Sequence, residues 1–153
     1  MMAEFEGKIA LVTGGTRGIG KAIVRDLLAV GFDVCLTARS AGDVEEAATD
    51  LSNAEGGRVL GLAADVRDPE GCESVVARVV KEFGGLDLLV NNAGVGRFAP
   101  IQEMSLEDWQ IQIDTNLSGV FYLSRAVLDL LRYPGNALPS RVELRPSQPP
   151  RKK

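Results

Sequence analysis

Short apolar runs alternate along the chain with longer segments in which apolar residues recur every three or four positions. Four runs are nearly continuous in apolar residues: 8–13, 33–38, 58–64 and 86–90. Runs of this kind are typical of strands that are buried on both faces of a sheet. Segments with helical spacing follow them, at 18–30, 42–55, 68–83 and 109–131. This alternation predicts a doubly wound α/β fold built around a parallel sheet.

Capping signals support the helix boundaries. Gly31 follows the first helical segment, and Pro69 stands in the first turn of the third, where its missing N–H costs nothing. Ser105 to Asp108 resembles a capping box at the start of the last helical segment. That segment, 109–131, carries apolar residues on more than one face, so we expect part of it to need a partner surface.

The helical pattern stops after Arg132, where the composition changes abruptly. Residues 132–153 hold five of the seven prolines, six basic residues and one acid. Proline at this density forbids a regular helix or a central strand. We therefore predict one domain over 1–132 and a disordered, basic, proline-rich tail over 133–153.

Composition excludes several classes of function. The 153 residues include no histidine, which removes the Ser-His relays and the histidine-ligated metal sites, and we expect no metal. No apolar run approaches the roughly 18 residues of a membrane helix. Cys35 and Cys72 lie within apolar or helical patterns and indicate reduced core thiols of a cytoplasmic protein. The cations of the tail lack interleaved aromatics and adjoin an acidic body, so we expect neither a nucleic-acid nor a membrane partner.

A glycine-rich turn closes the first apolar run and opens the first helix. The positions that would contact a nucleotide there are Thr13, Gly14, Thr16, Arg17, Gly18, Ile19 and Gly20. Glycines allow a pyrophosphate to approach the backbone, and the amides at the helix start, together with its positive dipole end, hold the phosphates. An ordinary tight turn is the alternative, but the position between a strand and a helix favours nucleotide binding.

Three further motifs occur at the ends of later elements. Asp65-Val66 follows the third run, Asn91-Asn92-Ala93-Gly94 follows the fourth, and Asn116 lies in the long helical segment. Taken singly, they have plain interpretations as a strand cap, a turn and a solvent-facing helix residue. In type, order and spacing, however, the four motifs together resemble the short-chain dehydrogenase/reductase family over residues 6 to about 131.

The resemblance implies a Rossmann-type fold, a nicotinamide cofactor and a small carbonyl or alcohol substrate. It implies that Asp65 and Val66 contact the adenine and that Asn92, Ala93 and Gly94 line the cofactor. It assigns Asn116 to the catalytic group, where it supports an active-site water and lysine, and places 96–98 at the active-site rim. Members of the family are commonly dimers or tetramers, so we expect a homo-oligomer or association with a full-length relative through the 108–131 helix.

The end of the second run discriminates between the two nicotinamide cofactors. A carboxylate there binds the ribose 2′-hydroxyl of NAD, whereas an arginine accommodates the 2′-phosphate of NADP. This chain has Arg39 and no acid at that position, and Arg17 lies in the glycine turn. Guanidinium groups suit phosphate through paired, charge-assisted hydrogen bonds. We therefore expect NADP (NADPH) to be favoured over NAD, with two solvated surface arginines as the alternative.

The chain does not contain the family's catalytic Tyr-x-x-x-Lys pair. Its two tyrosines, Tyr122 and Tyr133, are each followed four positions later by alanine. We expect a Rossmann-type sheet truncated after the fourth strand and the following long helix, by genuine truncation or by a frameshift. The expected function is NAD(P)-dependent oxidoreduction in the family, with this chain inactive or nearly so. The alternatives are a non-catalytic NADP-binding module and a fragment that docks on a full-length relative.

Overall fold

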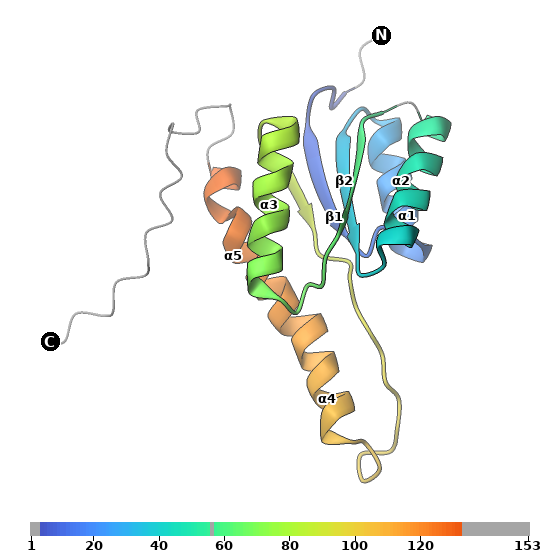
Figure 1. The fold of residues 1–153 in the computed structure, drawn as a ribbon, viewed down its shortest axis with the longest axis vertical. Coiled ribbons are helices and arrows are strands. Elements are labelled where there is room, and N and C mark those ends of the chain that lie inside the picture. Colours follow the sequence, from blue (N-terminus) through green and yellow to red (C-terminus); the bar gives the residue numbers. More distant parts are fainter. Residues whose placement is uncertain (1–3, 56, 133–153) are drawn as a thin grey trace, which may run out of the picture.

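The computed structural model describes residues 4–55 and 57–132 as alternating strands and helices (Figure 1). The strands are β1 (Ile9–Thr13), β2 (Asp33–Ala38), β3 (Val59–Ala63) and β4 (Leu88–Val90). The helices are α1 (Gly18–Ala29), α2 (Ala41–Glu55), α3 (Pro69–Phe83), α4 (Leu106–Ile113) and α5 (Gly119–Arg132), with a π-helical turn η1 (Asp114–Ser118) between the last two. The predicted tail, 133–153, lies outside the described residues.

The four strands form one parallel sheet in the order β3-β2-β1-β4. Thr13 at the end of β1 pairs with Thr37 of β2, and Thr37 pairs with Leu62 of β3. On the other side of β1, Val12 pairs with Val90 of β4. This register brings the carboxyl ends of all four strands to the same edge, which confirms the predicted fold class.

Successive residues of β1 enter two separate cores because side chains alternate across a strand. Ile9 and Leu11 pack with α3 and α5, whereas Ala10 and Val12 pack with α1 and α2. All four side chains are buried, which explains why the run is apolar at every position. The helices therefore cover both faces of the sheet, α1 and α2 on one face and α3 and α5 on the other (Figure 1).

Local capping agrees with the sequence pattern. The Asp68 side chain accepts a hydrogen bond from the Glu70 amide at the start of α3, and Pro69 occupies the first turn. The Ser105 hydroxyl accepts one from the Asp108 amide, 3.0 Å away, at the start of α4. Gly31 and Gly84 adopt positive φ, of 105° and 94°, after α1 and α3. Cys35 and Cys72 are free and buried, as predicted.

The predicted single helix over 109–131 is interrupted. The π-helical turn η1 separates α4 from α5, and the dihedral angles at its two ends stay in the helical region. A π turn adds one residue to a helical turn, so it rotates the side chains that follow relative to those before it. On its far side α5 packs against α3 and the sheet, while α4 and the chain leading to it extend away from the sheet (Figure 1).

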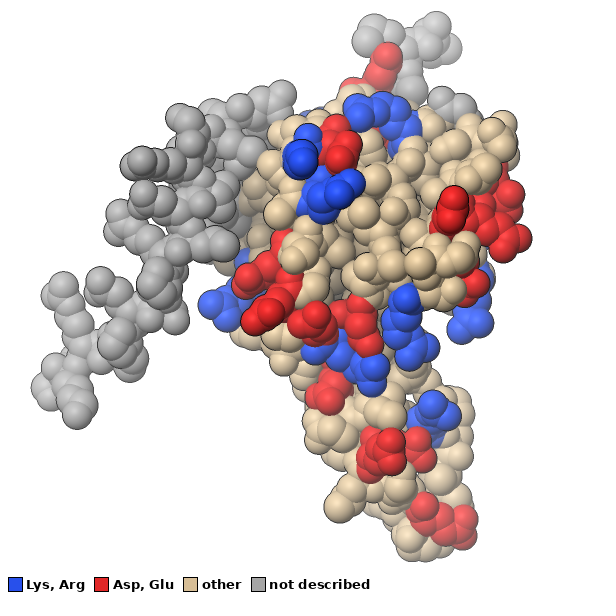
Figure 2. Space-filling model, viewed as in Figure 1, with Lys and Arg blue, Asp and Glu red and all other residues tan. Residues whose placement is uncertain are grey.

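Charged side chains of both signs are interspersed over the face of the molecule shown in Figure 2. The extension formed by α4 and the segment before it also carries both signs. Among the described residues, no helix is both long enough and apolar enough to cross a membrane.

A candidate nucleotide site at the carboxyl edge of the sheet

The glycine turn between β1 and α1 is built for a close approach of backbone. Gly14 and Gly18 have φ values of +65° and +54°, which favour glycine. A Cβ on Gly20 would overlap the carbonyl oxygen of Gly14, and a Cβ on Gly14 would lie 3.1 Å from the Cα of Ala93. Side chains at these two positions would fill the space in which the strand ends and the turn meet.

The start of α1 presents backbone amides without a side-chain cap. Arg17, at the N-cap, is extended and exposed, and no side chain of the described residues caps this end of the helix. The first amides of a helix have no partner within the helix and lie at the positive end of its dipole. Ile19 is 75% exposed on this turn, so it offers an apolar surface beside these amides.

Hydrogen bonds join the end of β4 to the end of β1. The buried Thr13 hydroxyl accepts bonds from the backbone amides of Asn92 (3.0 Å) and Ala93 (2.9 Å). The Asn92 side-chain amide donates to the carbonyl oxygens of Thr13 (2.9 Å) and Gly14 (3.1 Å). Two motifs about 80 residues apart in the chain thus form one unit of structure.

Asn116 holds the segment after β4 from the opposite side. Its Oδ1 accepts a bond from the Val95 amide at 2.9 Å, and its Nδ2 donates to the Val95 carbonyl at 2.8 Å. Asn116 lies in η1, and Gly119, which follows η1 at the start of α5, lies close to the segment after β3: a Cβ on Gly119 would be 2.8 Å from a methyl group of Val66. The amide side chain therefore fixes the segment that leaves the sheet beside Gly94.

Basic and acidic groups meet at the ends of β2 and β3. Arg39 follows β2 and is exposed. Asp65 follows β3 and forms an ion pair with Arg67, in which Nη2 and Oδ2 are 2.6 Å apart. Hydrogen bonds from Arg67 lower the pKa of the Asp65 carboxyl, and the charge of Arg39 lowers it further. Thr16 in the glycine turn is half-buried.

The structure thus brings the predicted residues to one edge of the sheet, from the ends of all four strands and from η1. Sequence reasoning missed Arg67, although a basic residue two positions after Asp65 was a signal for a local ion pair. It also missed the 3.3 Å hydrogen bond from Asn91 to Ser124 of α5.

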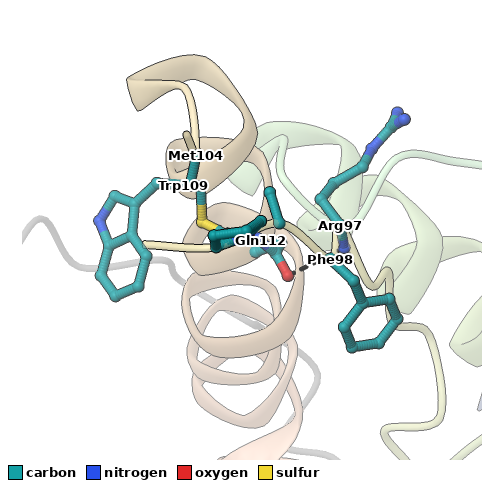
Figure 3. A pocket seen from close by; sticks show the side chains of 7 residues that line it. Arg97, Phe98, Met104, Trp109 and Gln112 are labelled. Carbon is teal, nitrogen blue, oxygen red and sulfur yellow. Dashed lines mark hydrogen bonds between the residues drawn. The ribbon is translucent and has the colours of Figure 1, made fainter. Parts of the chain in front are cut away.

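The predicted rim residues 96–98 lie farther out, on the extension. Arg97 and Phe98 line a hollow with Met104, Trp109 and Gln112 (Figure 3). The Arg97 amide donates to Gln112 Oε1 at 3.0 Å, which ties the extended segment to α4. The Phe98 and Trp109 side chains are 97% and 54% exposed.

A parallel sheet, a glycine turn before its first helix and polar groups at its carboxyl edge define a Rossmann-type nucleotide-binding protein. The family model for short chain dehydrogenases matches residues 8–137, and the chain belongs to this family.

Sequence relatives within the family act on different substrates, according to their names. The chain is 48% identical over 125 residues to the 3-oxoacyl-(acyl-carrier-protein) reductase FabG of Escherichia coli, covering 82% of the chain and 50% of the relative. It is 40% identical over 124 residues to the D-threitol dehydrogenase of Mycolicibacterium smegmatis, covering 81% and 47%. The chain therefore spans about half the length of the curated relatives it matches.

Solved structures agree with the fold. The L-sorbose reductase from Gluconobacter frateurii, complexed with NADPH and L-sorbose, has a TM-score of 0.81 and 39% identity. That match covers 86% of the chain and 50% of the reductase. A short chain dehydrogenase from Burkholderia cenocepacia in complex with NADP has a TM-score of 0.77 and 40% identity, covering 83% and 52%.

Proposed function

We propose that this chain binds NADP(H) at the carboxyl edge of its sheet, as the nucleotide-binding half of a carbonyl-reducing dehydrogenase. The observation that carries the proposal is the glycine turn before α1, in which Gly20 packs so closely on Gly14 that a Cβ on Gly20 would overlap the Gly14 carbonyl oxygen. Such a tight turn leads directly into the uncapped amides at the start of α1, which suit a pyrophosphate group. In this proposal Thr13, Gly14, Thr16, Arg17, Gly18, Ile19 and Gly20 surround the pyrophosphate, and residues 1–132 are one domain.

The remaining contacts follow from the strand order. Asn92, Ala93 and Gly94 line the nucleotide beside the end of β1, and Asp65 and Val66 lie at the adenine end. Arg39 binds the ribose 2′-phosphate with help from Arg17, so NADP(H) is preferred over NAD(H). The proposal is supported by the exposure of both arginines and by the NADPH and NADP complexes of two structural relatives.

Catalysis needs groups that this chain does not hold. The bound cofactor supplies a hydride, but a proton donor must serve the substrate oxygen. Tyr122 is half-buried in the core beside α3 and is followed four positions later by Ala126, and Tyr133 lies outside the described residues. Asn116 keeps a positioning role through Val95. We therefore infer nucleotide binding without turnover, in a family whose substrates are small carbonyls or alcohols.

Calorimetric titration of the 153-residue chain with NADPH, together with thermal melting, tests binding. We expect saturable binding and a raised Tm, because a ligand that binds the folded state stabilises it. Gly20→Ala should abolish both effects, because its Cβ would overlap the Gly14 carbonyl oxygen and displace the turn. Gly42→Ala is the matched control, because its Cβ would meet nothing within 4 Å. Absence of saturable NADPH binding to a chain that melts cooperatively would exclude the proposal.

Replacing Arg39 tests the cofactor preference. Arg39→Glu should lower NADPH affinity at least about tenfold, because it removes a charge-assisted hydrogen bond to phosphate and adds repulsion. NADH affinity should stay the same or rise, since a carboxylate can bind the ribose hydroxyls. Titrations with both nucleotides measure the ratio of the NADPH and NADH dissociation constants. Arg78→Ala on the exposed face of α3 is the control. An unchanged ratio would show that Arg39 does not bind the ribose 2′-phosphate.

A further inference from the structure

Gly119 marks a close approach of α5 to the segment that follows β3. It is buried at the start of the helix, and its φ of −61° and ψ of −39° are ordinary helical values. A Cβ at this position would lie 2.8 Å from a methyl group of Val66 and 3.0 Å from both the Cβ and the carbonyl oxygen of Val66. Because any residue can adopt this backbone conformation, the contact with Val66 is what requires glycine here.

Cys72 holds the same residue from the side of α3. Its thiol donates to the carbonyl oxygen of Val66, with Sγ 3.5 Å from that oxygen. Burial raises the pKa of this thiol to about 11, and the charge of Asp68 adds to the rise, so the thiol keeps its proton and remains a donor at neutral pH. The Val66 side chain packs against the core that α3 and α5 share with the sheet. Contacts from α3 and α5 therefore hold both the carbonyl group and the side chain of Val66.

The order of the strands places Val66 at one end of the proposed nucleotide. With the pyrophosphate at the end of β1 and the ribose phosphate at the end of β2, the base comes next, after the end of β3. Val66 is half-buried there, and its backbone amide forms no hydrogen bond within the described part of the chain. An unpaired backbone group in this place suits a polar atom of the base. This step rests on the proposed NADP(H) binding.

We propose that Gly119 and Cys72 are positioning residues, which set the place of the Val66 backbone at the base end of the nucleotide site. Gly119 lets α5 approach until the helix touches Val66, and Cys72 fixes the carbonyl group. The position of the Val66 amide nitrogen is then set as well, because nitrogen, side chain and carbonyl group share one Cα. Asn116, three positions before Gly119, holds the segment after β4. One helical turn thus contacts the segments that follow both β3 and β4.

Two ligands that differ in the base measure this property. We would displace NADPH from the full chain with adenosine 2′,5′-bisphosphate and with ribose 2,5-bisphosphate, which keeps both phosphates and lacks the base. NADPH fluorescence follows the displacement and gives the ratio of the two dissociation constants. The unaltered chain should bind the adenosine compound at least about tenfold more tightly. In Gly119→Ala the new methyl group displaces Val66, so this preference should fall at least about threefold.

Variants of Cys72 separate positioning from general damage. Cys72→Ala removes the donor to the Val66 carbonyl, so the preference for the adenosine compound should fall about threefold. Cys72→Ser keeps a donor in the same place and should retain the preference of the unaltered chain. Gly42→Ala is the matched control for Gly119→Ala, because its Cβ would meet nothing within 4 Å. Because each ratio compares two ligands on one protein, a general loss of affinity or stability cancels.

The outcomes distinguish this inference from the proposal on which it rests. An unchanged preference in Gly119→Ala and Cys72→Ala, or no preference for the adenosine compound in the unaltered chain, would overturn the positioning role and leave NADP(H) binding intact. If Gly119→Ala does not fold, the Cys72 variants decide, and equal losses in Cys72→Ala and Cys72→Ser would overturn the role of the donor. Failure of the unaltered chain to bind NADPH would overturn both.

Discussion

At the scale of single residues, the Thr13 hydroxyl joins the end of β1 to the segment that follows β4. It accepts hydrogen bonds from two backbone amides, and Thr13 is 1% exposed. Thr13→Val keeps the shape but removes the acceptor of the Ala93 amide and leaves the Asn92 amide only the Val90 carbonyl, which should cost about 2 kcal/mol of unfolding free energy. Urea unfolding measures the loss. The exposed Thr49→Val, which removes one helix-surface bond, should change stability by less than about 0.5 kcal/mol. Equal losses in both variants would contradict the role given to Thr13.

The buried thiol of Cys35 leads to a second prediction at this scale, on the pH dependence of stability. Burial raises the pKa of its thiol from 9.0 to about 12. The folded state then keeps the proton while the unfolded state loses it, so this stabilising contribution is present below pH 9 and falls as pH rises towards 12. Between about pH 8 and about pH 10.5 the free energy of unfolding should therefore fall by about 2 kcal/mol more in the unaltered chain than in Cys35→Ala.

Urea unfolding of both proteins at the two pH values gives this difference. All groups other than Cys35 are common to both proteins, so their effects cancel. Parallel losses in the two proteins would show that the Cys35 thiol ionises as readily in the folded state as in the unfolded one.

At the scale of elements, the strands were predictable and the interruption of the last helix was not. The side chains of Ile9 to Val12 alternate between two cores, so every position is apolar and the strand can be predicted from the sequence. In contrast, η1 keeps helical dihedral angles at its ends and leaves the apolar spacing on each side intact. The sequence also does not encode the rotamer of Arg67, which decides whether Asp65 is free or paired.

Asn116 gives the prediction that belongs to this scale. It joins η1 to the segment after β4 through both polar groups of Val95. Asn116→Ala should therefore speed exchange of the Val95 amide hydrogen about tenfold, because the amide loses its acceptor. Hydrogen exchange followed by NMR reports on that single amide. Gln110→Ala removes an exposed bond to Asp114 and should leave Val95 protected. Unchanged exchange in Asn116→Ala would show that other contacts hold the segment.

At the scale of the whole molecule, an edge of the sheet and an apolar stripe along η1 and α5 are uncovered in the described structure. Within 4–55 and 57–132, β4 pairs with β1 alone and forms an edge of the sheet. Leu117, Phe121 and Leu128 recur at helical spacing and are 64%, 59% and 45% exposed. Exposed apolar stripes of this kind mark surfaces that bind other protein surfaces. This surface coincides with the 108–131 segment for which the sequence predicts a partner.

We therefore expect the purified 153-residue chain to self-associate through this stripe. Phe121→Glu places a charge at its centre, and burying an unpaired charge is costly, so association should weaken at least about tenfold. Light scattering after size-exclusion chromatography, over a range of concentrations, measures the mass. Val30→Glu is the matched control, because Val30 is 40% exposed but lies at the end of α1, on the other side of the sheet. If Phe121→Glu and the unaltered chain have the same mass at every concentration, the stripe is not the surface of association, whereas an equal effect of Val30→Glu would point to general apolar exposure instead.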